Sequence, residues 1–118
     1  MIPNEIWLMI FRLMYDNLIR DIRKREFQEL RVKLYGIIDE MIGLTRWLNK
    51  YSHNLEDCSR MRDAVKDVRA NINTESLNKL RVSYYNQVKI LKDMSWKYKV
   101  KMCDTCHDWY KVQHKCKG

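Results

Sequence analysis

Three of the four cysteines and two of the three histidines lie within the last sixteen residues of the chain. In the segment CDTCHDWYKVQHKC, two residues separate Cys103 from Cys106, and one residue separates His114 from Cys116. Two cysteines at the first spacing can share one tight turn, and the second spacing projects both side chains to one side of an extended segment. Three thiolates and one imidazole form a closed tetrahedral set of the kind that holds structural Zn²⁺. The spacing therefore predicts a zinc site formed by Cys103, Cys106, His114 and Cys116.

His107 leaves one ligand open, because its imidazole can replace that of His114 with a different loop between the ligands. The string CDTCH also matches the attachment signature of c-type haem, and C-x-x-C pairs occur in thioredoxin-like redox sites. Haem attachment normally needs an export signal, and no strand–helix–strand pattern surrounds this motif. Zinc is therefore the better interpretation.

The segment resembles the short zinc knuckles of many proteins, with Trp109 and Tyr110 as an aromatic cover for the ion. Its C-x2-C-x7-H-x-C spacing differs from the C-x2-C-x4-H-x4-C spacing of retroviral nucleic-acid knuckles.

A catalytic zinc ion needs an open coordination position, whereas four protein ligands close this site. The chain also lacks an H-E-x-x-H motif, a nucleophile elbow and a Gly-rich phosphate loop. We expect no enzymatic activity, no catalytic residues and no small-molecule substrate.

Long helices must position this segment, because the chain has only three glycines and one proline. A β-sandwich or barrel of this length would need many tight turns and the residues that form them. Helical spacing predicts helices at about 4–18, 20–51, 55–71 and 75–100, of which the first two can be continuous. Ser52 and Asn54, and then Thr74 or Ser76, predict the breaks and caps between the later helices.

The most regular pattern is an apolar stripe that alternates steps of three and four residues for more than three heptads, as in a coiled coil. Another helix of the same chain or a second copy can cover it. Gly36 and Gly43 share one face of this stripe, which favours the close approach of a second helix over a bend. Cys58 lies on the stripe of the next helix and is predicted to be a buried thiol. We expect the first stripe to be the principal partner-binding surface; its members are Phe27, Leu30, Leu34, Ile37, Met41, Leu44, Leu48 and Tyr51.

These patterns predict an all-α fold of three or four long helices, arranged as a bundle or as extended helical hairpins. The helical domain should span residues 1–100, and a small zinc-binding knuckle residues 101–118. A helix of thirty residues is about 45 Å long, and a chain of this size can hardly cover it on every side. We therefore expect a homo-oligomer or docking to protein partners in a larger assembly.

The formal net charge of +8 suits either a solvated surface or an anionic partner. Nucleic acid is the alternative partner, and the basic residues near the C-terminus would bind it: Lys97, Lys99, Lys101, Lys111, Lys115 and Lys117. The chain has no run of eighteen apolar residues, so we expect no membrane span. No secretory signal is visible. Four cysteines without such a signal point to a reducing compartment, the cytoplasm or the nucleus.

The N-terminal stretch IPNEIWLMIFRLM, residues 2–14, resembles the opening helix of an F-box. The residues that match are Pro3, Glu5, Ile6, Leu8, Ile10 and Phe11. Short variants of this kind are similar to segments in proteins of large DNA viruses. The resemblance implies docking to a Skp1-type adaptor through Ile10 and Phe11. The charged stretch RDIRKREFQELR replaces the later short helices of that family.

Taken as a whole, the sequence predicts a structural or scaffold protein that packs its helices into a larger assembly, of which a virion is one example. A structural zinc ion would hold its C-terminal segment. The two alternatives are a basic zinc protein that binds nucleic acid and an adaptor of F-box type.

Overall fold

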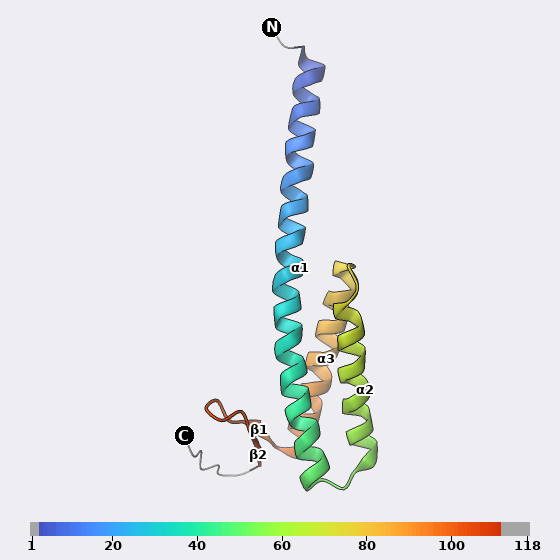
Figure 1. The fold of residues 1–118 in the computed structure, drawn as a ribbon, viewed down its shortest axis with the longest axis vertical. Helices are drawn as coiled ribbons and strands as arrows, with labels where there is room; N and C mark the ends of the chain where they lie inside the picture. The colour runs from blue at the N-terminus through green and yellow to red at the C-terminus, as the bar shows by residue number, and fades with distance from the viewer. Residues whose placement is uncertain (1–2, 112–118) are drawn as a thin grey trace.

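A computed structural model of the chain describes residues 3–111, which form three helices followed by a short hairpin (Figure 1). The helices are α1 (Asn4–Tyr51), α2 (Leu55–Ile72) and α3 (Leu77–Tyr98). Strands β1 (Lys101–Met102) and β2 (Trp109–Tyr110) form the hairpin. The predicted all-α class is confirmed, and the first two predicted helices are one continuous helix.

The helix ends follow local sequence signals. Helix α1 begins after Pro3, whose carbonyl accepts hydrogen bonds from the N–H groups of Ile6 and Trp7. Asn54 caps α2, because its side-chain oxygen accepts a hydrogen bond of 3.2 Å from the N–H of Asp57. The Ser76 hydroxyl accepts an equivalent bond from the third residue of α3 at 3.5 Å. The predicted breaks near residues 52–54 and 74–76 are therefore confirmed.

Helices α2 and α3 pack side by side against the C-terminal half of α1 (Figure 1). The core lies between these three elements and includes Cys58, which is 3% exposed, as predicted. The members of the core are Leu34, Ile38, Met41, Leu44, Leu48, Cys58, Met61, Ala64, Val65, Val68, Ile72, Leu80, Leu91, Met94 and Val100.

The apolar stripe of α1 faces the interior of the chain. Leu34, Met41, Leu44 and Leu48 are completely buried, because α2 and α3 cover them. The side chains at positions 27, 30 and 37 pack partly buried against the same core, and Tyr51 is 59% exposed at the helix end. The structure thus corrects the expectation that this stripe is the principal surface for other molecules.

The molecule is elongated because α1 is much longer than its neighbours. It measures 75 × 32 × 19 Å, with a radius of gyration of 21.1 Å. A compact domain of this length has a radius of gyration of about 13–14 Å. Helices α2 and α3 end near the middle of α1, where Arg81 forms an ion pair of 2.6 Å with Glu26. The N-terminal half of α1 therefore projects from the three-helix body (Figure 1).

A polar network closes the lower end of the body. Asp57, in the first turn of α2, accepts hydrogen bonds from Lys97 Nζ at 2.5 Å and from the Tyr98 hydroxyl at 2.6 Å. Tyr98 also accepts a bond of 3.2 Å from Ser52, just after α1. The hydrogen bond from Lys97, and then that from Tyr98, lower the pKa of Asp57. The bond to Asp57 in turn raises the pKa of Lys97. The network joins the ends of all three helices.

Candidate functional site

The end of α3 positions the cysteine-containing segment. Lys99 adopts a left-handed conformation with φ of 52° and terminates the helix. Its N–H donates to the carbonyl of Trp96, and the N–H of Val100 donates to that of Ser95 at 3.0 Å, which together form a Schellman motif. Val100 is 5% exposed and anchors the exit from the helix in the core. The chain therefore leaves the body at a fixed angle and enters β1.

Residues 101–111, which we call the knuckle, form a closed loop on a two-stranded base. Lys101 pairs with Tyr110, and Met102 with Trp109, in antiparallel register. Above the strands, the N–H of Cys103 donates to the carbonyl of residue 108 at 2.8 Å, and the N–H of residue 107 donates to the carbonyl of Cys103 at 2.9 Å. The backbone of residue 107 is left-handed, with φ of 61°. These bonds bring the two predicted ligands, at positions 103 and 106, onto one tight loop.

The structure describes some of the predicted zinc ligands and not the others. Cys103 is half-buried, and Cys106 and the alternative ligand His107 are exposed on the same loop. His114 and Cys116 lie outside the described residues. Among residues 3–111, no group of three or more His, Cys, Asp or Glu side chains is placed to hold a metal ion. The four-ligand zinc site stays a prediction.

The knuckle packs against α1 through Trp109. A Cβ atom added to Gly43 would lie 2.5 Å from Trp109 Nε1 and 2.9 Å from Trp109 Cδ1, so only glycine permits this contact. The close approach expected at Gly43 is therefore real, but an indole ring of the knuckle makes it and not a second helix. At Gly36 an added Cβ would meet no atom of residues 3–111 within 4 Å, so the described part of the chain shows no close approach there.

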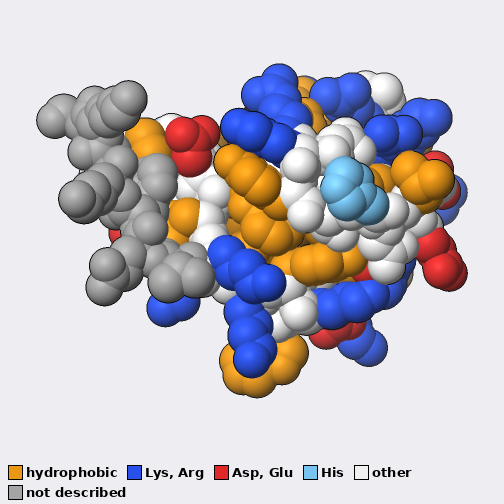
Figure 2. Space-filling view, turned by 90° about the horizontal axis from the view of Figure 1, so that it is seen from below, with side chains coloured by type: hydrophobic (Ala, Val, Ile, Leu, Met, Phe, Trp, Pro, Cys, Tyr) orange, Lys and Arg blue, Asp and Glu red, His pale blue; other side chains and the backbone are white. Residues whose placement is uncertain are grey.

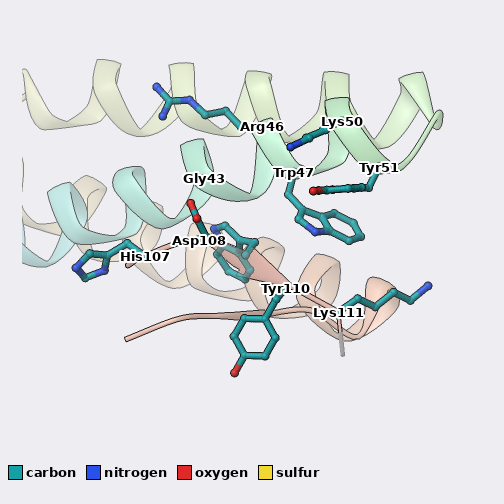
Figure 3. Close-up of a pocket in the computed structure, with 10 residues that line it drawn as sticks. Gly43, Arg46, Trp47, Lys50, Tyr51, His107, Asp108, Tyr110 and Lys111 are labelled. Carbon is teal, nitrogen blue, oxygen red and sulfur yellow. The ribbon is translucent and has the colours of Figure 1, made fainter. Parts of the chain in front are cut away.

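A pocket of about 570 Å³ separates the knuckle from the last turns of α1 (Figure 3). Trp47 and Tyr51 line it from the helix, and His107 lies at its far end. The Tyr110 ring turns away from α1. Arg46, Lys50 and the side chain at position 111 add positive charge to the lining. Such a lining can stack against planar groups and attract anions.

Basic residues gather at this end of the molecule. Seen from below, Lys and Arg side chains surround exposed hydrophobic ones, with Asp and Glu at fewer points (Figure 2). Of the lysines predicted to bind nucleic acid, Lys97 is paired with Asp57, and those at 99, 101 and 111 are exposed. Positions 115 and 117 lie outside the described residues. Nucleic-acid binding stays an alternative prediction for this end.

The other candidate site is the projecting part of α1, residues 4–25, which we call the arm. Nine of its ten residues from position 6 to position 15 are apolar, with Arg12 as the exception. All residues of the arm are exposed apart from Ile19, which is half-buried. The large apolar side chains that are 39–68% exposed are Ile6, Trp7, Leu8, Met9, Ile10, Phe11, Leu13, Met14, Tyr15, Leu18 and Ile22.

Sequence reasoning found only Ile10 and Phe11 of this surface, through the F-box resemblance. The missed signal was the continuous apolar run itself. A helix that is apolar on all sides is normally covered on all sides, and the stripe from Phe27 to Tyr51 engages the only two other helices that residues 3–111 contain. The arm thus has an apolar surface that the described residues leave uncovered.

Comparisons with known protein families, with curated proteins and with solved structures find no significant match to this chain. The resemblances to an F-box helix and to a zinc knuckle stay predictions. Within the described part of the chain, no helix has both the length and the apolar character needed to cross a lipid bilayer.

Proposed function

We propose that this chain is a non-enzymatic scaffold protein whose arm docks into a larger protein assembly. The observation that carries this proposal is the arm itself, a helix of more than five turns with eleven large apolar side chains exposed. Exposed apolar patches of more than a few hundred Å² are rare on monomeric proteins and mark interaction surfaces. The three-helix body, in contrast, has its apolar stripe covered and supplies a rigid base for the arm.

The arm suits a docking role because its length and stiffness are set by the body. Residues 27–51 of the same helix are held by α2 and α3, so the arm extends from a fixed root without a flexible linker. A partner therefore pays little ordering entropy for the direction of the arm. A Skp1-like adaptor is the partner that the F-box resemblance would imply, and Ile10 and Phe11 are 39% and 58% exposed for such contacts.

Size fractionation in the cells that produce the chain tests this proposal. The wild-type chain should elute in species well above its own 14.5 kDa. A variant with Phe11→Asp and Leu18→Asp should elute as a monomer, because two buried charges oppose docking. Val32→Asp is the matched control, since Val32 is 70% exposed on the same helix below the arm. The proposal is wrong if the arm variant elutes with the wild type while both fold equally well.

We also propose that a structural Zn²⁺ ion holds the C-terminal segment, bound by Cys103, Cys106, His114 and Cys116. Support comes from the closed loop that carries the first two of these residues. So small a segment has little interior of its own, and a metal ion commonly supplies the missing stability in such units. The ion would fix the chain that follows β2 against the knuckle.

Metal analysis of purified variants tests the zinc proposal. The wild-type chain should carry about one zinc ion per molecule. Cys106→Ser should lose most of it and leave residues beyond 102 with faster amide exchange, while α1–α3 keep their protection. Cys58→Ser is the matched control, because Cys58 is buried in the helical core far along the chain from the knuckle. Equal zinc content in the wild type and Cys106→Ser would contradict the assignment. His107→Ala and His114→Ala then identify which imidazole is the fourth ligand.

A further inference from the structure

The widest continuous apolar arc of the arm points in a different direction from the core of the body. At 100° per residue, eight apolar residues share an arc of about 140° that no polar residue between positions 5 and 24 interrupts. Their order around the helix is Met14, Trp7, Leu18, Phe11, Ile22, Tyr15, Leu8 and Ile19. The face that α2 and α3 cover lower down, around Met41, is turned by about 100° from the centre of this arc.

Polar residues occupy the arm where the core face of the body would continue. Arg12, Asp16 and Arg20 lie on that face, directly above the buried leucines of α1. Longer α2 and α3 helices would therefore meet charges and not the apolar arc. The occupant of the arc must come from outside this three-helix body.

We infer that the occupant is a second copy of this chain, whose arm pairs with the first in antiparallel orientation. This inference rests on the proposed docking role of the arm and names its partner. Antiparallel pairing places residue n of one copy beside residue 29 − n of the other when the centre lies between residues 14 and 15. Six of the eight residues of the arc then lie opposite one another: Trp7 faces Ile22, Phe11 faces Leu18, and Met14 faces Tyr15. The other two, Leu8 and Ile19, stand at the edge of the arc and are level with Asp21 and Ile10.

The charges beside the arc fit the same register. In an antiparallel pair with twofold symmetry, the same flank of both helices meets, so Arg12 of each copy is about level with Asp16 of the other on the outer flank of the pair. Glu5 of each copy is similarly about level with Arg23 of the other. A parallel pair instead brings opposite flanks together, so Arg12 of one copy and Asp16 of the other no longer share a flank. Exchange of these two charges therefore distinguishes the two orientations.

The available length and area also fit. Pairing from residue 5 to residue 24 covers about 30 Å of helix. Beyond it, Arg23, Phe27 and Leu77 line the edge of the three-helix body, so the tip of each arm would stop just outside the body of the other copy. With about 200 Å² for a large side chain, the exposed fractions of seven residues on the arc amount to roughly 800 Å² per copy, which is the most that the pair could bury there. A standard stable interface buries about 800 Å² on each partner.

Sedimentation equilibrium of the purified full chain, over a range of concentrations, tests this inference. The wild type should have twice the monomer mass of 14.5 kDa and dissociate on dilution. The variant with Phe11→Asp and Leu18→Asp should stay monomeric at every concentration, and Val32→Asp should match the wild type. Circular dichroism of each variant confirms that the helices persist.

A charge exchange then tests the orientation. Arg12→Asp places two carboxylates together at both symmetric contacts and should weaken the dimer about tenfold. Adding Asp16→Arg to that variant should restore the wild-type dissociation constant in the antiparallel register only. A dimer that the second substitution does not rescue would overturn the orientation.

Two results would overturn the inference as a whole. The first is a wild-type chain that sediments as a monomer at all concentrations. The second is a monomer that binds vesicles containing anionic phospholipid, with binding lost in the Phe11→Asp and Leu18→Asp variant, since a lipid surface would then be the occupant. If the purified chain is monomeric but still enters larger species in cells through its arm, the docking role stands and only the second copy is excluded.

Discussion

The two halves of α1 are similarly rich in large apolar residues, but only one of them forms a core. In the half from Phe27 to Tyr51, apolar residues recur on one face, and α2 and α3 cover that face. In the arm, the same face carries Arg12 and Asp16, while apolar residues occupy the faces beside it. The comparison shows that the angular position of apolar residues around a helix, and not their number, decides which of them the chain can bury itself.

The largest expected difference is between leucines of the same helix. Leu44→Ala should lower the free energy of unfolding by about 3 kcal/mol, because it leaves a cavity at a completely buried position. Leu13→Ala, at a residue that is 62% exposed in the arm and lies off the apolar arc, should change it by less than about 0.5 kcal/mol. Urea unfolding of both variants measures the difference. Similar losses in the two would mean that the arm packs against the body and that the comparison is wrong.

A smaller effect concerns the polar network that closes the covered half. Asp57→Asn should lower the free energy of unfolding by about 1–2 kcal/mol at neutral pH, because the amide replaces a carboxylate that accepts two hydrogen bonds. The pKa of Asp57 is lowered in the folded chain. Its contribution to stability is therefore fully present when the pH is above 3.8, the usual pKa of the carboxyl group, and is lost as the pH falls through the lower pKa of the folded chain. Lys97 has a raised pKa, so its contribution persists below 10.5 and is lost as the pH rises through the folded value.

The free energy of unfolding of the wild type and of Asp57→Asn, measured at several pH values, gives this contribution as the difference between the two proteins. The difference in free energy of unfolding between the wild type and Asp57→Asn should be largest between pH 4 and pH 10.5 and should become smaller below and above that window. The control is Asp39→Asn, at an exposed carboxylate of α1, whose free energy of unfolding should differ little from that of the wild type. A difference that stays constant down to pH 2 would exclude Asp57 as its source.

Much of the fold could be predicted from the sequence, because its signals are local. The helix starts after Asn54 and Ser76 follow from capping chemistry, and the burial of Cys58 follows from its place on an apolar stripe. The role of the arm was missed because its signal, the continuous apolar run of residues 6–15, also contains three–four spacing. The lengths of the helices agree with that signal: α2 and α3 extend for about 27–33 Å, so they cannot cover a helix of 48 residues.

The knuckle was predicted less completely for a different physical reason. The spacing of Cys103 and Cys106 is a local signal, and the closed loop that carries them agrees with it. The contact between Gly43 and Trp109 joins residues far apart in the chain, and no local pattern indicates which group fills the space beside a glycine. A glycine on an apolar stripe predicts a close approach, but the approaching group could be known only from the three-dimensional arrangement.

The smallest expected effect compares the two glycines of the covered half. Gly36→Ala should raise the free energy of unfolding by about 0.5–1 kcal/mol, because alanine favours the helix and nothing lies within 4 Å of its new methyl group. Gly43→Ala brings the same helical gain, but its methyl group displaces the Trp109 ring, so the net gain should vanish. Amide exchange should then quicken in residues 100–111 of Gly43→Ala alone. Equal stabilisation by both substitutions, with unchanged exchange, would mean that the indole ring does not rest on α1 in solution.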